Sequence, residues 1–358
     1  MSELQQPAFS PVLGSSEDEE DETIKKRWYH FLPLCCAVLL LLAPHPSLLY
    51  VLVNYHLLTL HSPLLFSLHL CVTYALTFLA FCSLIVCVAR DPGPVPSIEQ
   101  ENEQDSGMSL TDALMAPPDY DYTAPGKWCR VCWAPKHERT HHCSQCGRCV
   151  LKMDHHCPWI GGKCIGHRTY PSFLHFLFSI TLLSVYIAAI SIQGLSFAFR
   201  NPLAIDPVTP VNELFLAFAG VVFTMVIGSF FCYHIYLVLT NQTTIENISP
   251  FILLRHLPPL PPSDDTNRKL SNPPIEHELS YAQRRLVKDT RGVIRLYDLG
   301  WRNNLEQTFG PARASWRCWA ARMLWGGQCG GDGIKFPVNP RAEDMLARLA
   351  VELVRSDQ

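Results

Sequence analysis

The sequence predicts an all-α integral membrane protein, with four transmembrane helices and a cysteine-rich cytosolic domain between helices 2 and 3. Three observations support this prediction. Charged residues make up 17% of the 358 residues, well below the ~25% of soluble domains. The missing charge is concentrated in four long apolar segments rather than spread evenly. Seven of the 15 cysteines fall within 36 residues, between the second and third of these segments.

Each apolar segment is long enough for a transmembrane helix, which needs ~20 mostly apolar residues. The predicted spans are roughly Phe31–Val53, Pro63–Val88, Phe173–Phe199 and Leu214–Leu239. Within these bounds no Lys, Arg, Asp or Glu occurs. One buried helix of a soluble protein could be this apolar, but four of this length could not share an ordinary core. Pro44 and Pro46 predict a kink midway along the first span.

The distribution of Lys and Arg predicts the orientation in the membrane, because cytosolic loops carry an excess of both. Of the 29 basic residues, 3 precede the first span, 9 lie between spans two and three, and 16 follow span four. The two short loops hold one between them. Both termini and the long middle loop are therefore predicted to be cytosolic. We also expect no cleavable signal peptide, and the net charge of −3 gives no general attraction to nucleic acid.

The predicted orientation bears on two glycosylation sequons, which begin at Asn241 and Asn247. Both follow span four on the cytosolic side, so we expect neither to be glycosylated. Further along, several Trp and Arg residues of the tail predict contact with the membrane surface. They are Trp316, Arg317, Trp319, Arg322 and Trp325.

Composition divides the chain into segments. A disordered acidic cytosolic N-terminus is predicted at 1–30, transmembrane helices 1 and 2 at 31–88, a linker at 89–126, the cysteine-rich domain at 127–172, helices 3 and 4 at 173–240, and a cytosolic C-terminal region at 241–358. The linker is rich in Pro, Asp, Glu and Ser, as flexible connections are.

The cysteine spacing predicts metal binding. Paired cysteines two residues apart, followed closely by His and Cys, are typical of zinc sites. Disulfides are the alternative, but they are rare in the reducing cytosol. Seven Cys and five His exceed the needs of one tetrahedral site. Two Cys₃His sites would leave one cysteine over, whereas a Cys₂His₂ site would leave more. Cys157 follows Asp154, His155 and His156, as in a thiol site assisted by a base.

At this point the chain resembles a known family. The stretch Asp154–Cys157, within this cysteine array, is similar to the signature of the DHHC-type protein S-acyltransferases, or palmitoyltransferases. Asp91–Gly93 resembles the family's DPG motif, and Thr243–Glu246 resembles its TTxE motif. Asn304–Gly310 resembles the C-terminal asparagine motif. The resemblance covers most of the chain, and the cysteine array is its most specific part.

The resemblance implies how the zinc ligands divide between two structural zinc ions. One ion would take Cys129, Cys132, His142 and Cys149. The other would take Cys143, Cys146, His156 and Cys164. Because the two ligand sets interleave along the chain, loss of either ion should loosen both lobes.

The resemblance also implies an activity, protein S-palmitoylation. Cys157 would accept a long-chain acyl group from palmitoyl-CoA and pass it to a cysteine of a membrane-associated protein. A cysteine thiol is mostly protonated at neutral pH, so it needs a base. His155 would take the proton and Asp154 would orient the imidazole. The family default places such a protein in the Golgi or the endoplasmic reticulum.

Cations are expected to bind the phosphates of CoA. The candidates are Arg139, Lys136, Lys163 and Arg168, with Arg130 and Arg148 as further possibilities. Attraction of the same side chains to anionic lipid headgroups is an equally good interpretation.

The chain departs from the family pattern beside the nucleophile. The family usually reads Cys-Pro-Trp-Val-Asn-Asn-Cys, whereas this chain has one residue more, so Cys164 follows Cys157 by seven positions. Gly161 and Gly162 can absorb the insertion, because glycine accepts positive φ. Cys164 is the expected ligand, with His167 as the alternative. Beyond this region, Asp91 and Glu246 are expected to be structural anchors, and Asn304 a hydrogen-bonding brace.

Two other kinds of function were weighed. A non-catalytic zinc scaffold in the membrane would need none of Asp154, His155 and Cys157. A zinc-finger ubiquitin ligase or nucleic-acid binder would use all its ligands for metal and would lack the flanking motifs. The sequence therefore favours an acyltransferase.

Overall fold

The computed structural model describes residues 28–95, 128–132, 134–261, 270–311 and 315–356. Most of the predicted N-terminal segment and most of the predicted linker lie outside these residues. The described chain is mostly helical, with three short two-stranded antiparallel sheets between the second and third spans. This arrangement confirms the predicted fold class.

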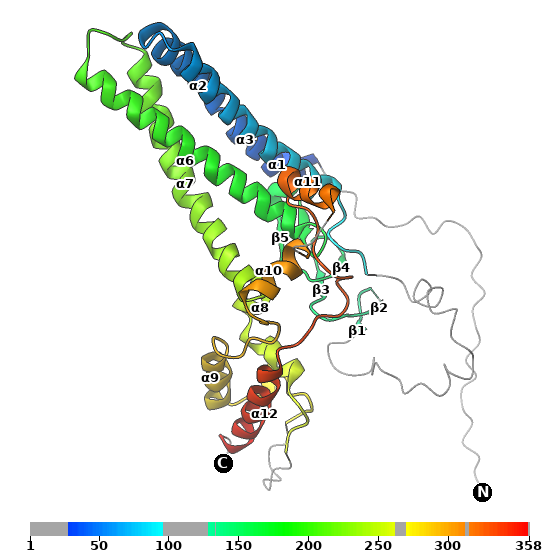
Figure 1. Ribbon diagram of the computed structural model, residues 1–358. Helices are drawn as coiled ribbons and strands as arrows, with labels where there is room; N and C mark the ends of the chain where they lie inside the picture. The colour runs from blue at the N-terminus through cyan, green and yellow to red at the C-terminus, as the bar shows by residue number, and fades with distance from the viewer. Residues whose placement is uncertain (1–27, 96–127, 133, 262–269, 312–314, 357–358) are drawn as a thin grey trace, which may run out of the picture.

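Among the described residues, four helical segments are long and apolar enough to cross a membrane. They are Trp28–Thr59, Pro63–Ala89 (α3), Tyr170–Arg200 (α6) and Thr209–Leu239 (α7). Figure 1 shows them side by side as an elongated bundle. The turns that join the first span to α3 and α6 to α7 lie at one end, and the sheets lie at the other.

The first span is a composite of several helices. A short 3-10 turn, η1 (Trp28–Phe31), leads into α1 (Leu32–Leu42) and α2 (Pro44–Val51). The span ends in a π-helix, η2 (Leu52–Thr59). The break at Ala43 follows from Pro44 at the first position of α2, as the sequence predicted. The span also continues past the predicted end at Val53. The amide of Asn54 donates to the Tyr50 carbonyl (2.9 Å), so this polar residue is accommodated within the helix.

The fourth span contains a carboxylate that the predicted bounds excluded. Helix α7 begins at Thr209 rather than Leu214, so it includes Glu213, whose side chain is fully buried. Within its observed bounds α7 therefore carries an acidic residue, although the predicted bounds held none. Gly194 of α6 faces this carboxylate, and a Cβ atom at that position would collide with Glu213 Oε1. Likewise α6 extends beyond its predicted bounds, from Tyr170 to Arg200.

Close packing of α6 against α7 and α3 forms the core of the bundle. At Gly220 of α7, an added Cβ would lie 2.9 Å from the Cβ of Ala188 on α6. Small residues at such contacts allow helix backbones to approach closely within a membrane. Helix α3 is capped at its start, where the Ser62 hydroxyl accepts from the Leu65 amide (3.4 Å) and Pro63 occupies the first turn.

The cysteine-rich domain is built from three ribbons. They pair β1 (Trp128–Cys129) with β2 (Ala134–Pro135), β3 (His141–Cys143) with β4 (Arg148–Val150), and β5 (His155–Cys157) with β6 (Lys163–Ile165). A 3-10 turn, η3 (Pro158–Ile160), joins the last two strands. Such short ribbons bury little apolar surface, so the domain depends on other stabilising interactions.

The end of α3 is tied to this domain through the Asp91–Gly93 motif. The Gly93 carbonyl accepts from the Leu151 amide (3.0 Å), and the Pro92 carbonyl accepts from the Arg168 amide (3.0 Å). Asp91 forms an ion pair with Arg148 at 2.8 Å. Asp91 therefore has the anchoring contacts that the sequence predicted.

The C-terminal region lies at the end of the bundle that carries the sheets, and α11 lies along its side (Figure 1). Its elements are α8 (Thr244–Ile248), η4 (Pro250–His256), η5 (Glu276–Glu278), α9 (Tyr281–Thr290), α10 (Trp301–Phe309), α11 (Trp316–Trp325) and α12 (Pro340–Arg355). Residues of η4, α9 and α12 share a second hydrophobic core. Asn304 braces α10 against α7, because its amide donates to the Leu239 carbonyl (2.7 Å).

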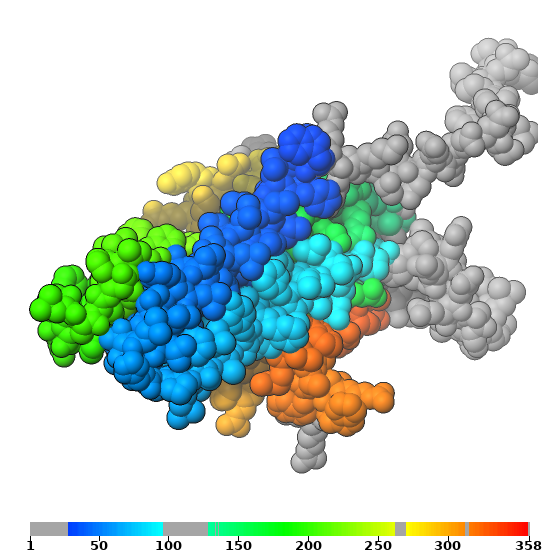
Figure 2. All heavy atoms as spheres, turned by 90° about the horizontal axis from the view of Figure 1, so that it is seen from above, coloured from blue at the N-terminus to red at the C-terminus, as the bar shows by residue number. Residues whose placement is uncertain are grey.

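Helix α11 carries the Trp and Arg residues that predicted contact with the membrane surface. It packs against α3 and α6, as Figure 2 shows for the orange helix beside the cyan one. Trp316 and Trp319 remain exposed on its outer face. Exposed aromatic rings on a helix that lies against two spans fit the expected interfacial position.

Candidate active site and metal centres

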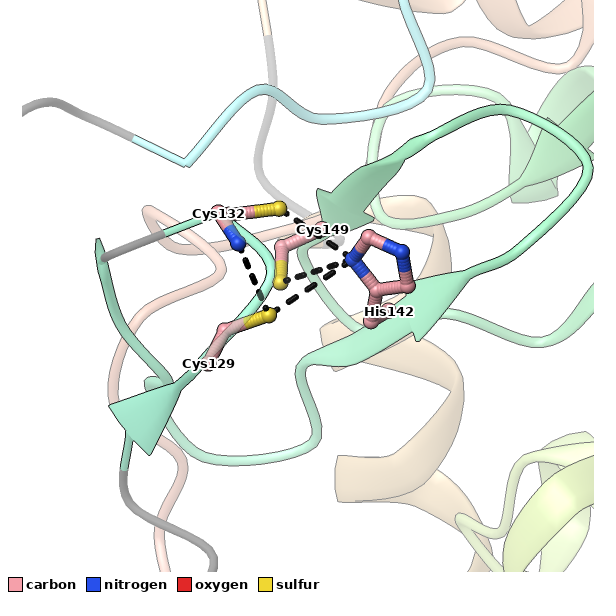
Figure 3. Close-up of side chains that lie close together, drawn as sticks. All are labelled: Cys129, Cys132, His142 and Cys149. Carbon is pink, nitrogen blue, oxygen red and sulfur yellow. Dashed lines mark hydrogen bonds between the residues drawn. The ribbon is translucent and has the colours of Figure 1, made fainter.

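The first metal-binding cluster joins β1, the turn after it, and the β3–β4 ribbon (Figure 3). Cys129, Cys132 and Cys149 surround the imidazole of His142. Their sulfur atoms lie 3.6, 3.1 and 3.9 Å from His142 Nδ1, respectively. The register of the ribbon explains part of this arrangement, because His142 lies directly opposite Cys149.

The second cluster joins the β3–β4 turn to the β5–β6 ribbon. Cys143, Cys146 and Cys164 approach His156 Nδ1, with sulfur atoms at 3.5, 3.4 and 3.8 Å. His156 lies directly opposite Cys164 in the ribbon. His167, the alternative ligand, is directed elsewhere, since its Nε2 lies 3.2 Å from the Gly331 carbonyl oxygen.

The inserted residue before Cys164 is absorbed in a left-handed turn. Gly161 and Gly162 have φ angles of 67° and 59°, a region that favours glycine. The turn brings the chain back so that Cys157 pairs with Lys163 and His156 pairs with Cys164. The two glycines therefore allow Cys164 to reach the second cluster despite the longer loop.

The spacing within both clusters fits a zinc ion. With Zn–S of about 2.3 Å and Zn–N of about 2.0 Å, a tetrahedron has S–N edges of about 3.5 Å. The six observed S–N distances run from 3.1 to 3.9 Å. Three cysteines and one histidine are also a typical structural zinc set. Both clusters could thus hold a metal ion.

The residues between and after these ligands form the candidate catalytic group. Asp154 Oδ2 lies 2.7 Å from His155 Nδ1, and the Asp154 side chain is almost completely buried. Cys157 ends the same strand and is 7% exposed. Burial alone lowers the pKa of His155, but the hydrogen bond with Asp154 and the nearby Cys157 thiol outweigh burial and raise it to about 9. This imidazole is thus a better proton acceptor than an ordinary histidine.

Thr244, at the start of α8, binds the Asp154 carboxylate from the other side. Its amide donates to Oδ1 (2.9 Å) and its hydroxyl donates to Oδ2 (2.7 Å). Burial alone raises the pKa of Asp154, but the bond with His155 and the Thr244 amide contribute to a net lowering. The carboxylate therefore stays ionised and fixed in position.

Arg139 connects the cysteine-rich domain to the segment after α7. Its side chain is fully buried, and it donates to both oxygens of Glu246 at 2.7 Å. It also donates to the side-chain and main-chain oxygens of Asn241, each at 3.0 Å. The expectation that Arg139 binds CoA phosphates therefore disagrees with the structure. Glu246, in contrast, has the anchoring contact that the sequence predicted.

The other cations expected to bind phosphate are placed differently. Arg168 is exposed, and Lys136 is half-buried. The Lys163 ammonium is also half-buried and donates to the Val88 carbonyl at the end of α3. Lys163 directly follows the Gly161–Gly162 turn and pairs with Cys157 in the ribbon.

An apolar cavity of about 360 Å³ opens beside Cys157. Cys157 and Trp159 line it at the cytosolic side predicted from the sequence, and residues of α1, α6 and α7 form its walls. Along α6 the lining runs from Phe173 to Ile187, a helical rise of about 21 Å. The cavity is thus long, narrow and almost entirely apolar.

Some contacts of the candidate site were not foreseen from the sequence. Thr244 was recognised only as part of a motif, and its bonds to Asp154 depend on the approach of two segments 90 positions apart. His234 of α7 lies near Asp154 and His155, but a single histidine within an apolar run gives no signal of this kind. Phe173, which packs on His155 with ring centroids 5.2 Å apart, likewise reads as an ordinary apolar residue.

Comparison with known proteins gives one consistent result. A family model described as DHHC palmitoyltransferase matches residues 123–250. The chain is 31% identical to "Probable protein S-acyltransferase 15" of Arabidopsis thaliana over 246 residues, which cover 68% of this chain and 80% of that protein. It is 32% identical to "Palmitoyltransferase ZDHHC15" of Xenopus laevis and 32% identical to "Palmitoyltransferase ZDHHC2" of Mus musculus.

The matches to the frog and mouse proteins cover 66% and 62% of this chain. They span 57% and 49% of those relatives' own lengths. All three relatives carry the name of the same kind of enzyme, and the matched region contains both metal clusters and Cys157. The chain therefore belongs to the DHHC palmitoyltransferase family.

Proposed function

We propose that this protein is a protein S-palmitoyltransferase, which moves a long-chain acyl group from acyl-CoA to cysteine thiols of membrane-associated proteins through a thioester on Cys157. One observation carries the proposal. Cys157 lies between a histidine–aspartate pair and the mouth of a long apolar cavity. An extended chain advances about 1.2 Å per bond, so a palmitoyl group of about 18 Å matches the cavity's length.

In the first stage, His155 takes the proton of the Cys157 thiol. Its Nδ1 is bonded to Asp154, so Nε2 is the nitrogen left for this role. The thiolate attacks the carbonyl carbon of the acyl-CoA thioester and forms a new carbon–sulfur bond. The CoA sulfur leaves as the old bond breaks, and it takes the proton from His155. Asp154 stabilises the imidazolium that exists between these events.

In the second stage, the thiol of a protein substrate attacks the Cys157 thioester. His155 takes the proton of the incoming thiol and returns it to the departing Cys157 sulfur. The enzyme is thereby restored, and the acyl group stays on the target. The same base serves both stages because both transfer an acyl group between sulfur atoms.

The proposed phosphate-binding cations are Lys136, Lys163 and Arg168. Arg139 is left out of this set because its guanidinium is bonded to Glu246 and Asn241. Lys163 is supported by its position opposite Cys157 in the β5–β6 ribbon. A cation there would lie near the point where the CoA portion meets the acyl thioester.

Two zinc ions would be held by the two Cys₃His clusters. Zinc would supply folding energy that the short ribbons lack, and no chemical step requires it. His156 would serve as a ligand, which fixes the backbone on either side of it. His155 and Cys157 are thus held by a strand that the metal sites anchor.

The proposed topology has both termini and the cysteine-rich domain in the cytosol, where acyl-CoA is found. It is supported by the excess of Lys and Arg in these segments. The acyl chain would then enter the membrane region from the cytosolic side. We propose an endomembrane location, the Golgi or the endoplasmic reticulum, on the basis of family membership.

The proposal is tested by measuring acyl transfer with purified protein. The full chain in detergent is incubated with palmitoyl-CoA and a cysteine-containing acceptor protein, and released CoA and acylated acceptor are measured. We expect both products from the wild type and neither from Cys157→Ser. Equal turnover by the two proteins would refute the proposed role of Cys157, and a wild type without turnover would favour a non-catalytic scaffold.

A further inference from the structure

His234 is a fully buried histidine on the mostly apolar helix α7. Its Nδ1 lies 3.2 Å from the hydroxyl of Tyr170, the first residue of α6. Phe173 and Phe230 pack on its ring nearly edge-to-face, with centroids 5.1 and 4.6 Å away. A polar group in such a place is costly unless it is hydrogen-bonded. Packing alone therefore does not account for a histidine here.

The position of His234 beside Asp154 and His155 offers a reason for a histidine at this place in α7. One of its ring nitrogens, a ring nitrogen of His155 and a carboxylate oxygen of Asp154 all lie within 4.8 Å of one another. The two imidazole rings have centroids 5.9 Å apart. Within the described residues, His234 Nε2 has no hydrogen-bond partner. Nε2 is thus a buried polar atom without a partner, on a ring that lies beside the reacting groups.

A third metal ion does not explain why Asp154, His155 and His234 lie close together. Two ligands of one tetrahedral zinc ion are separated by about 3.4 Å, whereas Asp154 Oδ2 and His155 Nδ1 are 2.7 Å apart. That distance is a hydrogen bond. Asp154 Oδ2 also accepts from the Thr244 hydroxyl, so the carboxylate is already bonded within the protein.

We propose that His234 is a positioning residue for acyl transfer, which fixes the His155 imidazole against Asp154 through its free Nε2. Asp154 binds one edge of that imidazole, Phe173 packs on it, and His234 approaches from α7. Catalytic hydrogen bonds are often long without substrate and tighten in the reacting complex. Because Tyr170 occupies Nδ1 and both nitrogens of His155 already have roles, Nε2 would make the tightened contact with the Asp154 carboxylate.

The inference rests on the proposed acyltransferase function, and it predicts which replacement of His234 preserves activity. Glutamine places an amide near the Nε2 position, whereas asparagine places one near Nδ1. If the contact with the catalytic pair matters, glutamine substitutes for histidine and asparagine does not. If His234 serves only to bind Tyr170, the order is reversed.

The experiment uses the full chain in detergent with palmitoyl-CoA, and it measures the first-order rate of Cys157 acylation as a function of palmitoyl-CoA concentration. The variants are His234→Phe, His234→Gln and His234→Asn. The matched control is His175→Gln, a histidine of α6 whose two nitrogens contact Ser83 and the Met323 carbonyl instead. Zinc content is measured for each protein.

A positioned base contributes about 10²–10⁴ in rate, so we expect loss of its support in His234→Phe to lower the maximal acylation rate about tenfold. The half-saturating palmitoyl-CoA concentration should stay within about twofold, since substrate binding is not affected. His234→Gln should keep most of the rate, and His234→Asn should be as slow as His234→Phe. His175→Gln should match the wild type.

Three results would overturn the inference. They are a wild-type rate in His234→Phe, equal rates in the Gln and Asn variants, or a faster Asn variant. If His234→Phe does not fold, the comparison of Gln with Asn decides the question. Failure of the proposed function itself looks different, because the wild type would then carry no label that depends on Cys157.

Discussion

At the scale of single residues, the candidate site depends on how completely the Asp154 carboxylate is bonded. It receives the Thr244 amide on one oxygen, and it lies against the Thr244 hydroxyl and His155 on the other. A buried carboxylate held in this way keeps the Nδ1 proton of the imidazole on the Asp154 side, so Nε2 is the nitrogen that exchanges a proton with the thiol.

Replacing Thr244 by valine should slow acylation while leaving the shape of the site intact. The substitution removes one hydrogen bond to a charged group, which is worth about 1.5–3 kcal/mol, and leaves the amide bond to Oδ1 in place. We expect the rate of Cys157 acylation to fall about tenfold, measured in a single turnover with palmitoyl-CoA. Thr181→Val is the control, because the Thr181 hydroxyl donates to a carbonyl of its own helix (2.8 Å). An unchanged rate in Thr244→Val would show that the hydroxyl is dispensable.

Arg139 and Glu246 form the other residue-scale feature, a buried ion pair. Burial raises the pKa of Glu246, but the Arg139 charge and hydrogen bonds outweigh burial and lower it. Arg139 also lies over the ring of Tyr297, 4.4 Å from its centroid. The pair therefore joins three parts of the chain, the cysteine-rich domain, the segment after α7 and the C-terminal region.

Removing one partner of this pair should destabilise the protein more than removing both. Arg139→Gln leaves the Glu246 carboxylate buried without its partner, which costs about 3–5 kcal/mol. In Arg139→Gln/Glu246→Gln no charge is left unpaired, so part of the loss should be recovered. Thermal unfolding in detergent measures both. A double variant less stable than either single variant would contradict this account.

At the scale of elements, sequence patterns predicted the type and order of the helices better than their ends. Hydrophobic length identified all four spans, and Pro44 identified the break in the first. The end of that span at Thr59 and the start of α7 at Thr209 were missed. Both misses occur where polar residues continue a helix and find partners or burial in three dimensions. The hydropathy of a sequence contains no information about such contacts.

The β5–β6 ribbon shows a departure from the family pattern that the local backbone accommodates. The left-handed turn at Gly161 and Gly162 places Cys164, rather than His167, beside His156. We expect Cys164→Ser to lower the zinc content from two ions per chain, because it removes a ligand that no nearby side chain replaces. His167→Ala should keep two ions. Metal analysis of the purified variants checks this, and the opposite pattern would assign the ligand to His167.

At the scale of the whole molecule, the fold places a polar environment on one side of the Cys157 sulfur atom and an apolar one on the other. On one side are the buried polar groups of the cysteine-rich domain, and on the other is a cavity walled by α1, α6 and α7. The ligands of the two metal clusters interleave along the chain, so we expect loss of either metal ion to loosen the ribbon that contains β5. The architecture thus joins an apolar cavity among the spans, the proposed acyl-chain site, to the Cys157 thiol at its edge.

The far end of the cavity should determine which acyl chains fit. Ala219 and Gly220 of α7 line it there, opposite Ile187 of α6. Ala219→Phe should shorten the cavity and shift the ratio of acylation rates with myristoyl-CoA and palmitoyl-CoA at least about tenfold toward the shorter chain. The two chains differ by two methylenes, and each methylene in an apolar pocket is worth roughly 1–3 kcal/mol.

The matched control for this prediction is Met225→Phe, which adds a ring on the exposed face of α7, where Met225 is 69% exposed. It should leave the ratio unchanged. A ratio unaffected by Ala219→Phe, or shifted equally by both substitutions, would place the acyl chain elsewhere.

The candidate site was only partly predictable from the sequence. Spacing alone predicted zinc and suggested at least one spare cysteine. The family resemblance supplied the division of ligands that the structure brings together. Arg139 was expected to bind phosphate, but it binds Glu246. The sequence does not show whether an arginine in a basic segment binds a phosphate or a buried glutamate. Thr244 and His234 could not be placed, since their contacts with Asp154 and His155 join distant parts of the chain.

The most direct test of the account is to locate the acyl group itself. Full-length protein is incubated with palmitoyl-CoA and digested, and its cysteine peptides are identified by mass spectrometry with and without hydroxylamine. The account predicts a hydroxylamine-sensitive palmitoyl group on Cys157, absent from Cys157→Ser and from Asp154→Ala. A wild-type protein acylated on another cysteine while Cys157 stays unmodified would contradict it.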